Sequence, residues 1–266
     1  MITATCMGRL GFLGNQLFQY GLIRAVAAKL RVEPAIPDRL DRDTWRRTKG
    51  WVELGPFAGS HVPRHSPTYE PPRTYAEKHF HYDPAVFEQP DGTDFSGYFQ
   101  SWRYLSSLPK ETFAFLPEWN KKIQDGVDRL RAEAQSRGFE RLVSVHVRRG
   151  DYLKHPDVHV VVDRTYIMSG VELFKTSLPV IFSDDPDWCR QHLPGHWLLG
   201  NTGCAWTDMG IMSRCDDNII AASTFSWWGA YLNPSSVKTV VAPKQWFNPK
   251  VGHDTSDLIP PGWIQL

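Results

Sequence analysis

The most informative stretch of this chain is Val143-Ser144-Val145-His146-Val147-Arg148-Arg149-Gly150-Asp151-Tyr152. Its first half alternates like a β-strand, and its second half gathers charge. A guanidinium presents a rigid fork of donors that matches the geometry of a phosphate. In open α/β sheets, ligands bind beyond the carboxyl ends of the strands. The stretch therefore predicts a phosphorylated ligand at the end of a parallel strand.

The charged residues of this stretch are expected to have separate roles. Adjacent side chains at the end of a strand point to opposite faces. We expect Arg148 to reach the ligand and Arg149 to pair with a carboxylate such as Asp151. The alternative is a surface ion pair without a ligand. His146 shares a face with Arg148 under strict alternation, so it either contacts the ligand, accepts a proton or is an ordinary core histidine.

Around this stretch, the second half of the chain alternates strands and helices. That pattern is typical of a parallel, doubly wound sheet. Strands are expected at residues 142–147, 179–183, 218–222 and 238–242. Helices are expected at residues 166–175, from Pro186 onward, at 206–214 and at 226–232.

Two further strand ends carry polar residues. Asp185 is explained as the N-cap of the helix that begins at Pro186. Asp184 has no such structural role and is expected to contact a ribose or a purine edge. Ser223-Thr224-Phe225-Ser226 stand at a helix N-terminus, where hydroxyl and backbone N–H groups form an anion cradle. Ordinary N-capping is the alternative, but it needs only one hydroxyl.

The first half begins with a strand at residues 2–7, a glycine-rich turn and a helix at residues 16–30. Gly14, Asn15 and Gln16 form a second possible cradle there, with a tight turn plus cap as the alternative. Residues 34–95 are rich in proline and aromatic residues, which predicts an elaborated surface of short helices and loops.

A polar helix is expected at residues 117–137, and Gly138 suits its C-terminal stop. Its buried face is predicted from the helical spacing of apolar residues: Ile123, Val127, Leu130 and Ala134. We expect the boundary between two domains, residues 1–138 and 139–266, to follow this helix.

The composition narrows the class of ligand. The net charge of +1 provides no global basic field for nucleic acid or acidic lipid. The four cysteines form no CxxC pair, so free thiols in a reducing compartment are expected. No apolar stretch approaches a membrane span and no signal peptide is evident, so we expect a cytoplasmic protein, with peripheral membrane association left open.

A metal is not expected. The D-x-D patterns at Asp41-x-Asp43 and Asp185-x-Asp187 arise readily by chance in a chain with 22% charged residues. Mg²⁺ usually binds through carboxylates together with substrate phosphate, and here arginine is available to neutralise the phosphate instead.

Taken together, the sequence motifs resemble those of glycosyltransferase family 11, the α-1,2-fucosyltransferases. The resemblance rests on motifs that follow one another in the family's order: Gly14-Asn15-Gln16-Leu17-Phe18-Gln19-Tyr20, Gly97-Tyr98-Phe99-Gln100-Ser101, His146-Val147-Arg148-Arg149-Gly150-Asp151-Tyr152, Phe182-Ser183-Asp184-Asp185, Ser223-Thr224-Phe225-Ser226-Trp227-Trp228-Gly229-Ala230 and Ala242-Pro243-Lys244-Gln245-Trp246-Phe247. A match to five or more motifs in order is far more specific than any one of them.

The resemblance implies a GT-B fold, which is α/β with two Rossmann-like domains and a cleft between them. Residues 1–138 would then form the acceptor-side domain, and residues 139–266 the GDP-sugar-binding domain. It implies a GDP-fucose donor, a terminal β-galactoside acceptor that receives fucose on its 2-hydroxyl, inversion at the anomeric carbon, and neither metal nor cofactor. By matching positions, Arg148 would bind the β-phosphate, and Ser223 to Ser226 would hold the diphosphate. His146 and Asp184 would contact the nucleoside.

The resemblance also bears on the residues of the first half and on the catalytic base. Asn15 would lie near the reacting centre, with Gly14 and Gln16 beside the donor. The sequence names no clear base: Asp151 and His146 are candidates, and an oxocarbenium-like path with late proton loss is the alternative.

The chain departs from the family pattern at Asp217, where histidine is common, and at Ala222, where asparagine is common. Both positions precede the diphosphate motif. Residues 34–95 match poorly and are expected to set acceptor choice. The competing functions are a fucosyltransferase for protein or core sugar, a non-catalytic GDP- or glycan-binding protein and a glycosidase. The last would leave the phosphate-binding features unexplained.

Overall fold

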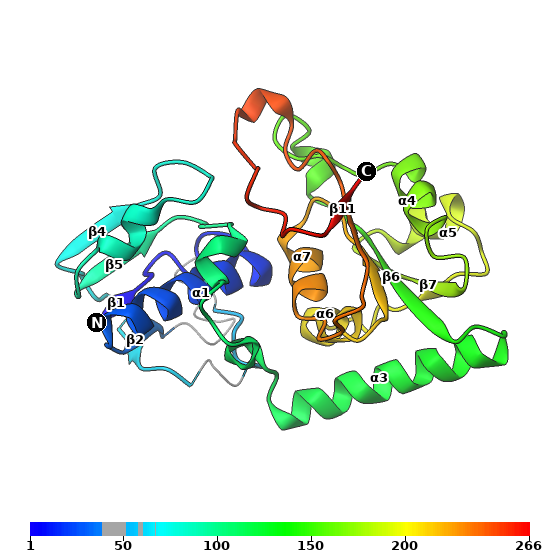
Figure 1. Cartoon of the computed structure of the whole chain (residues 1–266), viewed down its shortest axis with the longest axis horizontal. Coiled ribbons are helices and arrows are strands. Elements are labelled where there is room, and N and C mark those ends of the chain that lie inside the picture. The colour runs from blue at the N-terminus through cyan, green and yellow to red at the C-terminus, as the bar shows by residue number, and fades with distance from the viewer. Residues whose placement is uncertain (39–51, 58–60, 67) are drawn as a thin grey trace. The chain divides into compact units, whose positions relative to one another are not determined.

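The computed structural model of the chain describes residues 1–38, 52–57, 61–66 and 68–266. The pattern Asp41-x-Asp43 lies outside these residues. The described chain consists of two compact units, each with its own sheet (Figure 1). Unit 1 comprises Met1–Leu116 and His253–Pro260, and unit 2 comprises Pro117–Gly252 and Pro261–Leu266.

The sheet of unit 1 is parallel and has the strand order β3-β2-β1-β5-β4. Its strands are β1 (Ile2–Thr3), β2 (Pro34–Pro37), β3 (Arg64–His65), β4 (Arg73–Ala76) and β5 (Thr93–Ser96). The order reverses at β1, which has β2 on one side and β5 on the other. This reversal is a topological switch point, where doubly wound sheets leave room for a ligand beyond the strand ends.

The expectation of short helices and loops at residues 34–95 is incomplete for the described part of that range, because β2, β3, β4 and most of β5 also lie in it. These strands span only two to four residues, and prolines delimit β2, so neither alternation nor a long apolar run is visible in the sequence. The first strand is also shorter than expected. The Asp94 carboxylate accepts hydrogen bonds from the backbone N–H and hydroxyl of Thr5, at 2.6 and 2.9 Å, where the chain turns away after β1.

Helix α1 (Leu13–Leu30) follows this turn and is buried on most sides, not along one face. It begins three residues earlier than expected, with Phe12 as its N-cap, so Gly14 lies inside the helix. The short 3₁₀ helices of unit 1 are η2 (Pro84–Glu88), η3 (Trp102–Leu105) and η4 (Lys110–Phe113).

The sheet of unit 2 is also parallel and has the order β11-β10-β9-β6-β7-β8. Its strands are β6 (Arg141–Val147), β7 (Ser177–Ser183), β8 (Leu198–Leu199), β9 (Asp217–Ile219), β10 (Val240–Ala242) and β11 (Ile264–Gln265). Read from β8, this is the 3-2-1-4-5-6 order of a Rossmann sheet, with its switch point between β6 and β9. The expected doubly wound sheet is confirmed, and β8 and β11 are additional strands.

The helices of unit 2 are α3 (Pro117–Ser136), α4 (Arg164–Val171), α5 (Pro186–His192), α6 (Ala205–Met212) and α7 (Thr224–Tyr231), with the 3₁₀ helices η5 (Tyr152–Lys154) and η6 (Pro249–Val251). Each expected helix of the second half is present, within a few residues at its ends. Pro186 is the first residue of α5, as expected.

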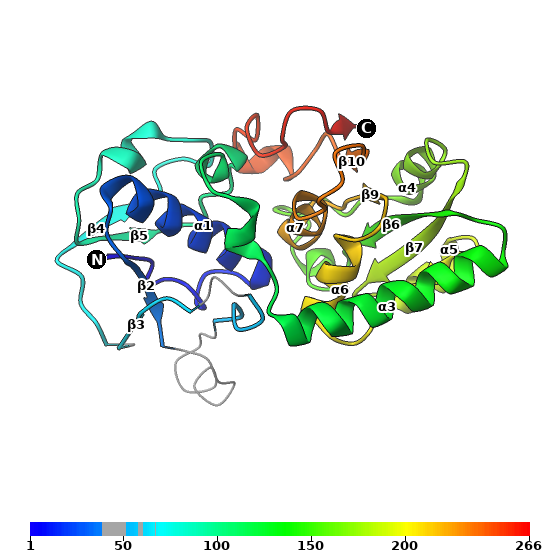
Figure 2. The same cartoon turned by 60° about the horizontal axis from the view of Figure 1, so that its bottom comes forward.

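Helix α3 packs against α6 and β6 of unit 2 (Figure 2). Its four predicted core residues are all buried, and Gly138 follows it with a positive φ of 80°. Because α3 buries this face against unit 2, the units divide between Leu116 and Pro117, earlier than the expected boundary after residue 138. The segment His253–Pro260 is a further difference, since it belongs to unit 1.

The core of unit 2 fixes the strand that carries the arginines. Val143, Val145 and Val147 of β6 are fully buried, and they pack with Ile181 of β7 and Ile219 of β9 in one cluster. Burial of such a side chain contributes roughly 1.5–3 kcal/mol. This packing holds the end of β6, and thus Arg148, at the switch point.

Candidate active site

Arg148 is the first residue after β6. Its guanidinium lies 2.5 Å from Asp151 (Nη2 to Oδ1) and 3.1 Å from Asp184 (Nη1 to Oδ2). It also lies 5.3 Å from the centre of the Tyr152 ring. The side chain is 26% exposed, so it is held on three sides and still reaches solvent.

Arg149 is held by the neighbouring strand end. Its Nε lies 3.0 Å from Oδ2 of Asp185, and its guanidinium lies 4.2 Å from the centre of the Trp188 ring. The expected pairing of Arg149 with Asp151 is therefore wrong, because Asp151 pairs with Arg148. Val147 is in register with Ser183, so β6 and β7 end side by side and Asp185 comes within reach of Arg149.

Asp184 joins the two strand ends. One carboxylate oxygen accepts the backbone N–H of Arg149 at 2.9 Å, and the other faces Arg148. Gly150 is required for this approach, since a Cβ on it would lie 2.5 Å from Oδ2 of Asp184. Asp185 is confirmed as the N-cap of α5, because it accepts the Trp188 N–H at 3.1 Å.

The N-terminus of α7 completes this edge. Tyr152 connects it to Arg148, since the Tyr152 hydroxyl donates to the Ala222 carbonyl oxygen at 3.1 Å and its side chain bonds Ser223. Ser223 is the N-cap residue but makes no side-chain capping bond, so ordinary capping does not explain its hydroxyl. The first-turn N–H groups of a helix lack intrahelical acceptors and carry partial positive charge.

The four residues of the Ser223–Ser226 motif differ in exposure. Thr224 and Phe225 are partly exposed, whereas Ser223 and Ser226 are buried. The Ser226 hydroxyl donates to the Ser223 carbonyl oxygen at 3.2 Å. The Ser226 hydroxyl is therefore used within the first turn of α7. The backbone N–H groups of that turn and the partly exposed Thr224 are the groups of the motif that can face a ligand.

His146 lies beneath Arg148 and is 5% exposed. Its ring centre is 5.4 Å from that of Phe225, and within the described chain its Nδ1 has no hydrogen-bond partner. Burial, with a smaller contribution from the Arg148 charge, lowers the pKa of His146 to about 3. A histidine with so low a pKa is a poor proton acceptor, which argues against its candidacy as the base.

The predicted residues of the first half lie at the switch point of unit 1. The Gln100 amide Nε2 donates to Oδ1 of Asn15 at 2.8 Å, which joins two of the sequence motifs. Gln16 is buried and accepts the backbone N–H of Glu53 at 2.7 Å. Gly14 is buried inside α1. These residues belong to unit 1, whereas Arg148 and its partners belong to unit 2.

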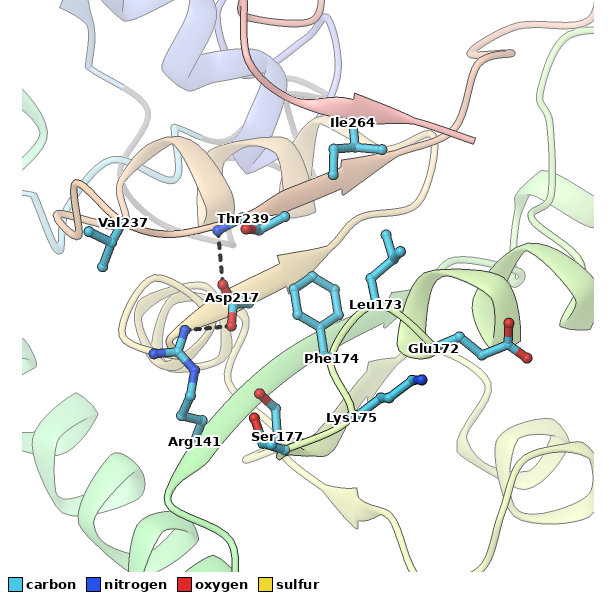
Figure 3. A pocket seen from close by; sticks show the side chains of 11 residues that line it. Arg141, Glu172, Leu173, Phe174, Lys175, Ser177, Asp217, Val237, Thr239 and Ile264 are labelled. Carbon is cyan, nitrogen blue, oxygen red and sulfur yellow. Dashed lines mark hydrogen bonds and ion pairs between the residues drawn. The ribbon is translucent and has the colours of Figure 1, made fainter.

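A pocket of about 710 Å³ lies at the opposite, amino-terminal edge of the unit 2 sheet (Figure 3). Among its lining residues, Asp217 accepts from Arg141 at 2.7 Å and from the Thr239 backbone N–H at 2.8 Å. Asp217 therefore lies at the far end of β9 from the Ser223 motif, and this departure from the family pattern does not affect the strand-end site. Ala222, the other departure, directly precedes the motif.

Within the described ranges, no group of three or more histidine, cysteine or acidic side chains is placed to hold a metal ion. Asp185 and Asp187 are instead paired with Arg149 and Arg190. The four cysteines are free thiols, as expected. Over the same described part of the chain, no helix combines the length and hydropathy needed to cross a membrane.

Comparison with known proteins decides the family. The model of Glycosyl transferase family 11 matches residues 85–266, which is more than half of the chain. The chain belongs to glycosyltransferase family 11. This confirms the resemblance drawn from the sequence motifs.

Several curated proteins are similar to this family member. The O-antigen biosynthesis glycosyltransferase WbnK of Escherichia coli is 36% identical over 46% of this chain and 44% of its own length. The galactoside alpha-(1,2)-fucosyltransferase 1 of Bos taurus is 27% identical over 84% of this chain and 64% of its own length. The chain thus spans roughly half to two thirds of the length of these relatives.

Among solved structures, the fucosyltransferase NodZ from Bradyrhizobium is similar in fold. It matches with a TM-score of 0.50 and 14% identity, over 88% of this chain and 93% of that chain. The two doubly wound α/β units are those of the GT-B type, so the expected fold class is confirmed.

The sequence motifs did not reveal every residue that shapes the two edges. Tyr152 and Gln100 stand inside quoted motifs, but their roles as connectors appear only in the structure. The contact of Trp188 with Arg149 could not be predicted, because no motif distinguishes this tryptophan from the other ten in the chain. The role of Glu77 could not be predicted either. Its carboxylate accepts the backbone N–H groups of Tyr98 and Phe99, both at 2.7 Å.

Proposed function

We propose that this chain transfers L-fucose from GDP-fucose to the 2-hydroxyl of a terminal β-galactoside, with inversion and without a metal. The observation that carries the proposal is the arginine fork of Arg148 at the switch point of a Rossmann sheet, next to a helix N-terminus. Membership of family 11 and the names of the relatives from Bos taurus and Mus musculus, both galactoside α-1,2-fucosyltransferases, support the donor sugar and the linkage.

The proposed role of Arg148 is to bind the diphosphate of the donor. Negative charge grows on GDP as its bond to fucose breaks, and fixed donors aimed at that charge lower the barrier. Asp151 and Asp184 hold the guanidinium in place before the donor arrives. Its five N–H donors exceed these two contacts, so phosphate oxygens have donors to engage. The N–H groups at the start of α7 supply the second half of the cradle.

We propose Asp184 and His146 as contacts of the nucleoside. Asp184 is one quarter exposed and lies between the two strand ends. His146 stays neutral above its lowered pKa of about 3, so it offers a hydrogen bond from its ring and no charge. A buried imidazole nitrogen without a partner is an energetic cost that a ligand hydrogen bond would remove.

We propose Asp151 as the group that accepts the proton of the acceptor hydroxyl. It is 46% exposed, and it contacts Arg148 at the site of the leaving group. The substitution Asp151→Asn separates this role from simple pairing. As a base, Asp151 contributes about 100-fold to turnover, and its loss leaves GDP affinity intact or improved. Turnover within twofold of the parent enzyme would assign Asp151 to holding Arg148 alone.

The deciding experiment measures GDP release from GDP-fucose against a panel of galactosides. Lactose and a β-galactoside already substituted at the 2-hydroxyl form a matched pair, and only lactose is expected to give turnover and a new α-1,2 linkage by NMR. Equal release with both acceptors, or none with either, would contradict the proposal. GDP binding without turnover would indicate a non-catalytic binding protein.

A different donor sugar is the second candidate. An Escherichia coli relative named an alpha-1,2-colitosyltransferase is 32% identical over 47% of this chain. Colitose is fucose without its 3-hydroxyl. The donor panel therefore includes GDP-fucose and GDP-colitose, and the larger kcat/KM identifies the donor.

The metal-free part of the proposal has its own test. Full transfer is expected in excess EDTA, since Arg148 and the α7 N-terminus supply the positive charge for the diphosphate. Loss of activity that Mg²⁺ restores would require a metal in the mechanism.

A further inference from the structure

The Tyr152 ring contacts a second side chain besides Arg148. His159 is stacked on it, with the ring centres 4.0 Å apart and the two planes inclined by only 9°. The Arg148 guanidinium lies 5.3 Å from the centre of the same ring. His159 lies outside the sequence motifs, although its ring covers the tyrosine that contacts the arginine fork.

Tyr152 is held both at its hydroxyl and at its ring. The hydroxyl donates to the Ala222 carbonyl oxygen at 3.1 Å, and the side chain also bonds Ser223. Burial raises the pKa of Tyr152, so its hydroxyl stays protonated near neutral pH and remains a donor. The stacked His159 ring restricts rotation of the tyrosine ring. Tyr152 is therefore restrained in the orientation in which it contacts both Arg148 and the N-terminus of α7.

The loop at residues 152–159, which carries both rings, has little packing of its own. Every residue between the two rings is exposed. Exposed loops open at a low free-energy cost unless other contacts hold them. An antiparallel β-bridge between His159 and Phe247 supplies one such contact. Phe247 begins the segment at residues 247–251, which includes η6 and which we call the brace.

Asn248 fastens the brace to this loop. Its backbone N–H donates to the Val158 carbonyl oxygen at 2.9 Å, and its Nδ2 donates to the Pro156 carbonyl oxygen at 3.0 Å. The Oδ1 of the same side chain caps η6, because it accepts the Lys250 backbone N–H at 3.0 Å. One amide thus uses its donor for the loop and its acceptor for the brace, which holds the two segments in a fixed geometry.

We infer that His159 and Asn248 are positioning residues for the arginine fork. Asn248 holds the loop against the brace, so that His159 fixes the plane of the Tyr152 ring. Tyr152 in turn holds the Arg148 guanidinium beside the N-terminus of α7. The inference rests on the proposed function and deepens it, because the guanidinium held in this way is the proposed phosphate ligand. A guanidinium oriented in advance loses less freedom when a phosphate binds, so the brace raises both GDP affinity and the rate of transfer.

The test uses the full chain and compares His159→Ala with His159→Phe, because phenylalanine keeps a stacked ring and removes the imidazole. The alanine variant is expected to lower both GDP affinity and kcat about three- to tenfold, the range for loss of a stacked aromatic pair. The phenylalanine variant stays within about twofold of the parent enzyme, and the acceptor KM for lactose is unchanged in both. His196→Ala, which removes another ring-contacting histidine of unit 2, just before β8, is the matched control and changes none of these quantities. Equal losses in the two His159 variants, or no loss in either, would overturn the role of the stacked ring.

A second variant tests the brace, and a double variant tests whether the brace and the ring act together. Asn248→Ala is expected to weaken GDP binding about three- to tenfold. Lys250→Ala, which breaks an exposed ion pair with Asp157 on the same turn, is the control and leaves GDP binding unchanged. Because Asn248 acts through His159, the chain with both alanines should bind GDP no more weakly than the weaker of the two single variants. Losses that add up in the double variant would show that the two residues act separately and would overturn the inference.

Calorimetry with GDP separates this inference from the proposed function, because it does not depend on transfer. If the parent chain binds GDP but transfers no fucose, the proposed function fails and the same series of affinities still decides the inference. If the parent chain transfers fucose and both alanine variants bind GDP as tightly as it does, the inference fails and the proposed function stands. A parent chain that does not bind GDP contradicts both. Measurement well below the melting temperature of every variant excludes unfolding as the cause of a loss.

Discussion

Each unit carries a switch point in a parallel sheet, but the side chains at the two switch points differ in chemistry. At the end of β6, Arg148 and Arg149 interlock with carboxylates. At the end of β1, the side chains are amides and aromatic rings, represented by Asn15, Gln100 and Phe12. The parallel sheet determines where a ligand can bind, and the loops determine which ligand it is. An ionic edge suits a nucleoside diphosphate, and an amide and aromatic edge suits a neutral sugar.

The ionic edge is not simply a positive patch. Its two arginines face three carboxylates, Asp151, Asp184 and Asp185. A phosphate must therefore share Arg148 with acidic partners. The gain from this arrangement is a guanidinium that is oriented before the donor binds, which is the form of electrostatic catalysis that costs no reorganisation during the reaction.

The largest effect is expected from replacing the guanidinium of Arg148 at the ionic edge. Arg148→Lys is expected to lower kcat/KM about 100-fold or more, because an ammonium group cannot reproduce the bidentate geometry. Arg141→Lys is the matched control at the opposite edge of the same sheet, and it is expected to stay close to the parent enzyme. Steady-state kinetics with GDP-fucose and lactose checks both. Near-normal turnover of Arg148→Lys would refute the phosphate role.

The buried histidine next to Arg148 predicts an acid sensitivity of the ionic edge. The unfolded chain protonates this histidine below its ordinary pKa of 6.5, whereas His146 in the folded chain stays neutral down to about 3. Above pH 6.5 His146 is neutral in both the folded and the unfolded chain and costs no stability. As the pH falls from 6.5 toward 3, only the unfolded chain gains the proton, so the free energy of unfolding decreases. At pH 5 the loss amounts to about 2 kcal/mol in the free energy of unfolding.

Denaturant unfolding at pH 7 and pH 5 tests this expectation. His146→Gln removes the titrating group, so its free energy of unfolding should fall less between the two pH values than that of the parent chain. An identical fall in both proteins would mean that His146 titrates normally in the folded state.

The join between the two strand ends of unit 2 offers a milder perturbation. Gly150→Ala places a methyl group 2.5 Å from Oδ2 of Asp184, the oxygen that pairs with Arg148. We expect GDP affinity to fall about tenfold while the melting temperature changes little, because the carboxylate can swing aside. Gly195→Ala, where the added atom meets nothing within 4 Å, is the control. Equal GDP affinity in both variants would show that the Asp184 contact is dispensable.

The last variant separates structure from binding at the amide edge, and it is expected to have no effect on GDP affinity. Gln16→Ala removes a buried amide that holds the Glu53 backbone, so we expect a loss of about 1–3 kcal/mol in the free energy of unfolding. GDP affinity should stay unchanged, since Gln16 belongs to the packing of unit 1. Gln135→Ala, on the exposed face of α3, is the control for a simple change of helix propensity. A specific loss of GDP affinity in Gln16→Ala would restore its predicted role beside the donor.

Much of unit 2 could be predicted because its elements are long enough to show their period. The alternation in Val143–Val147 and the spacing of Ile123, Val127 and Leu130 each identified an element and its buried face. Unit 1 could not be predicted in this way. Its strands span two to four residues, and α1 is buried on most sides, so neither period appears.

The candidate site, like the fold, was predictable from the sequence only in part. The sequence by itself determined the family, the parallel sheet of unit 2 and the place of Arg148 at the end of a strand, because local patterns and motif order carry that information. The tertiary structure decided the partners. Register between β6 and β7 assigned Asp185 to Arg149, and burial lowered the pKa of His146. The adjacency of β1 and β5 brought Asn15 to Gln100. Pairing between residues distant in the chain depends on packing, and no local pattern records it.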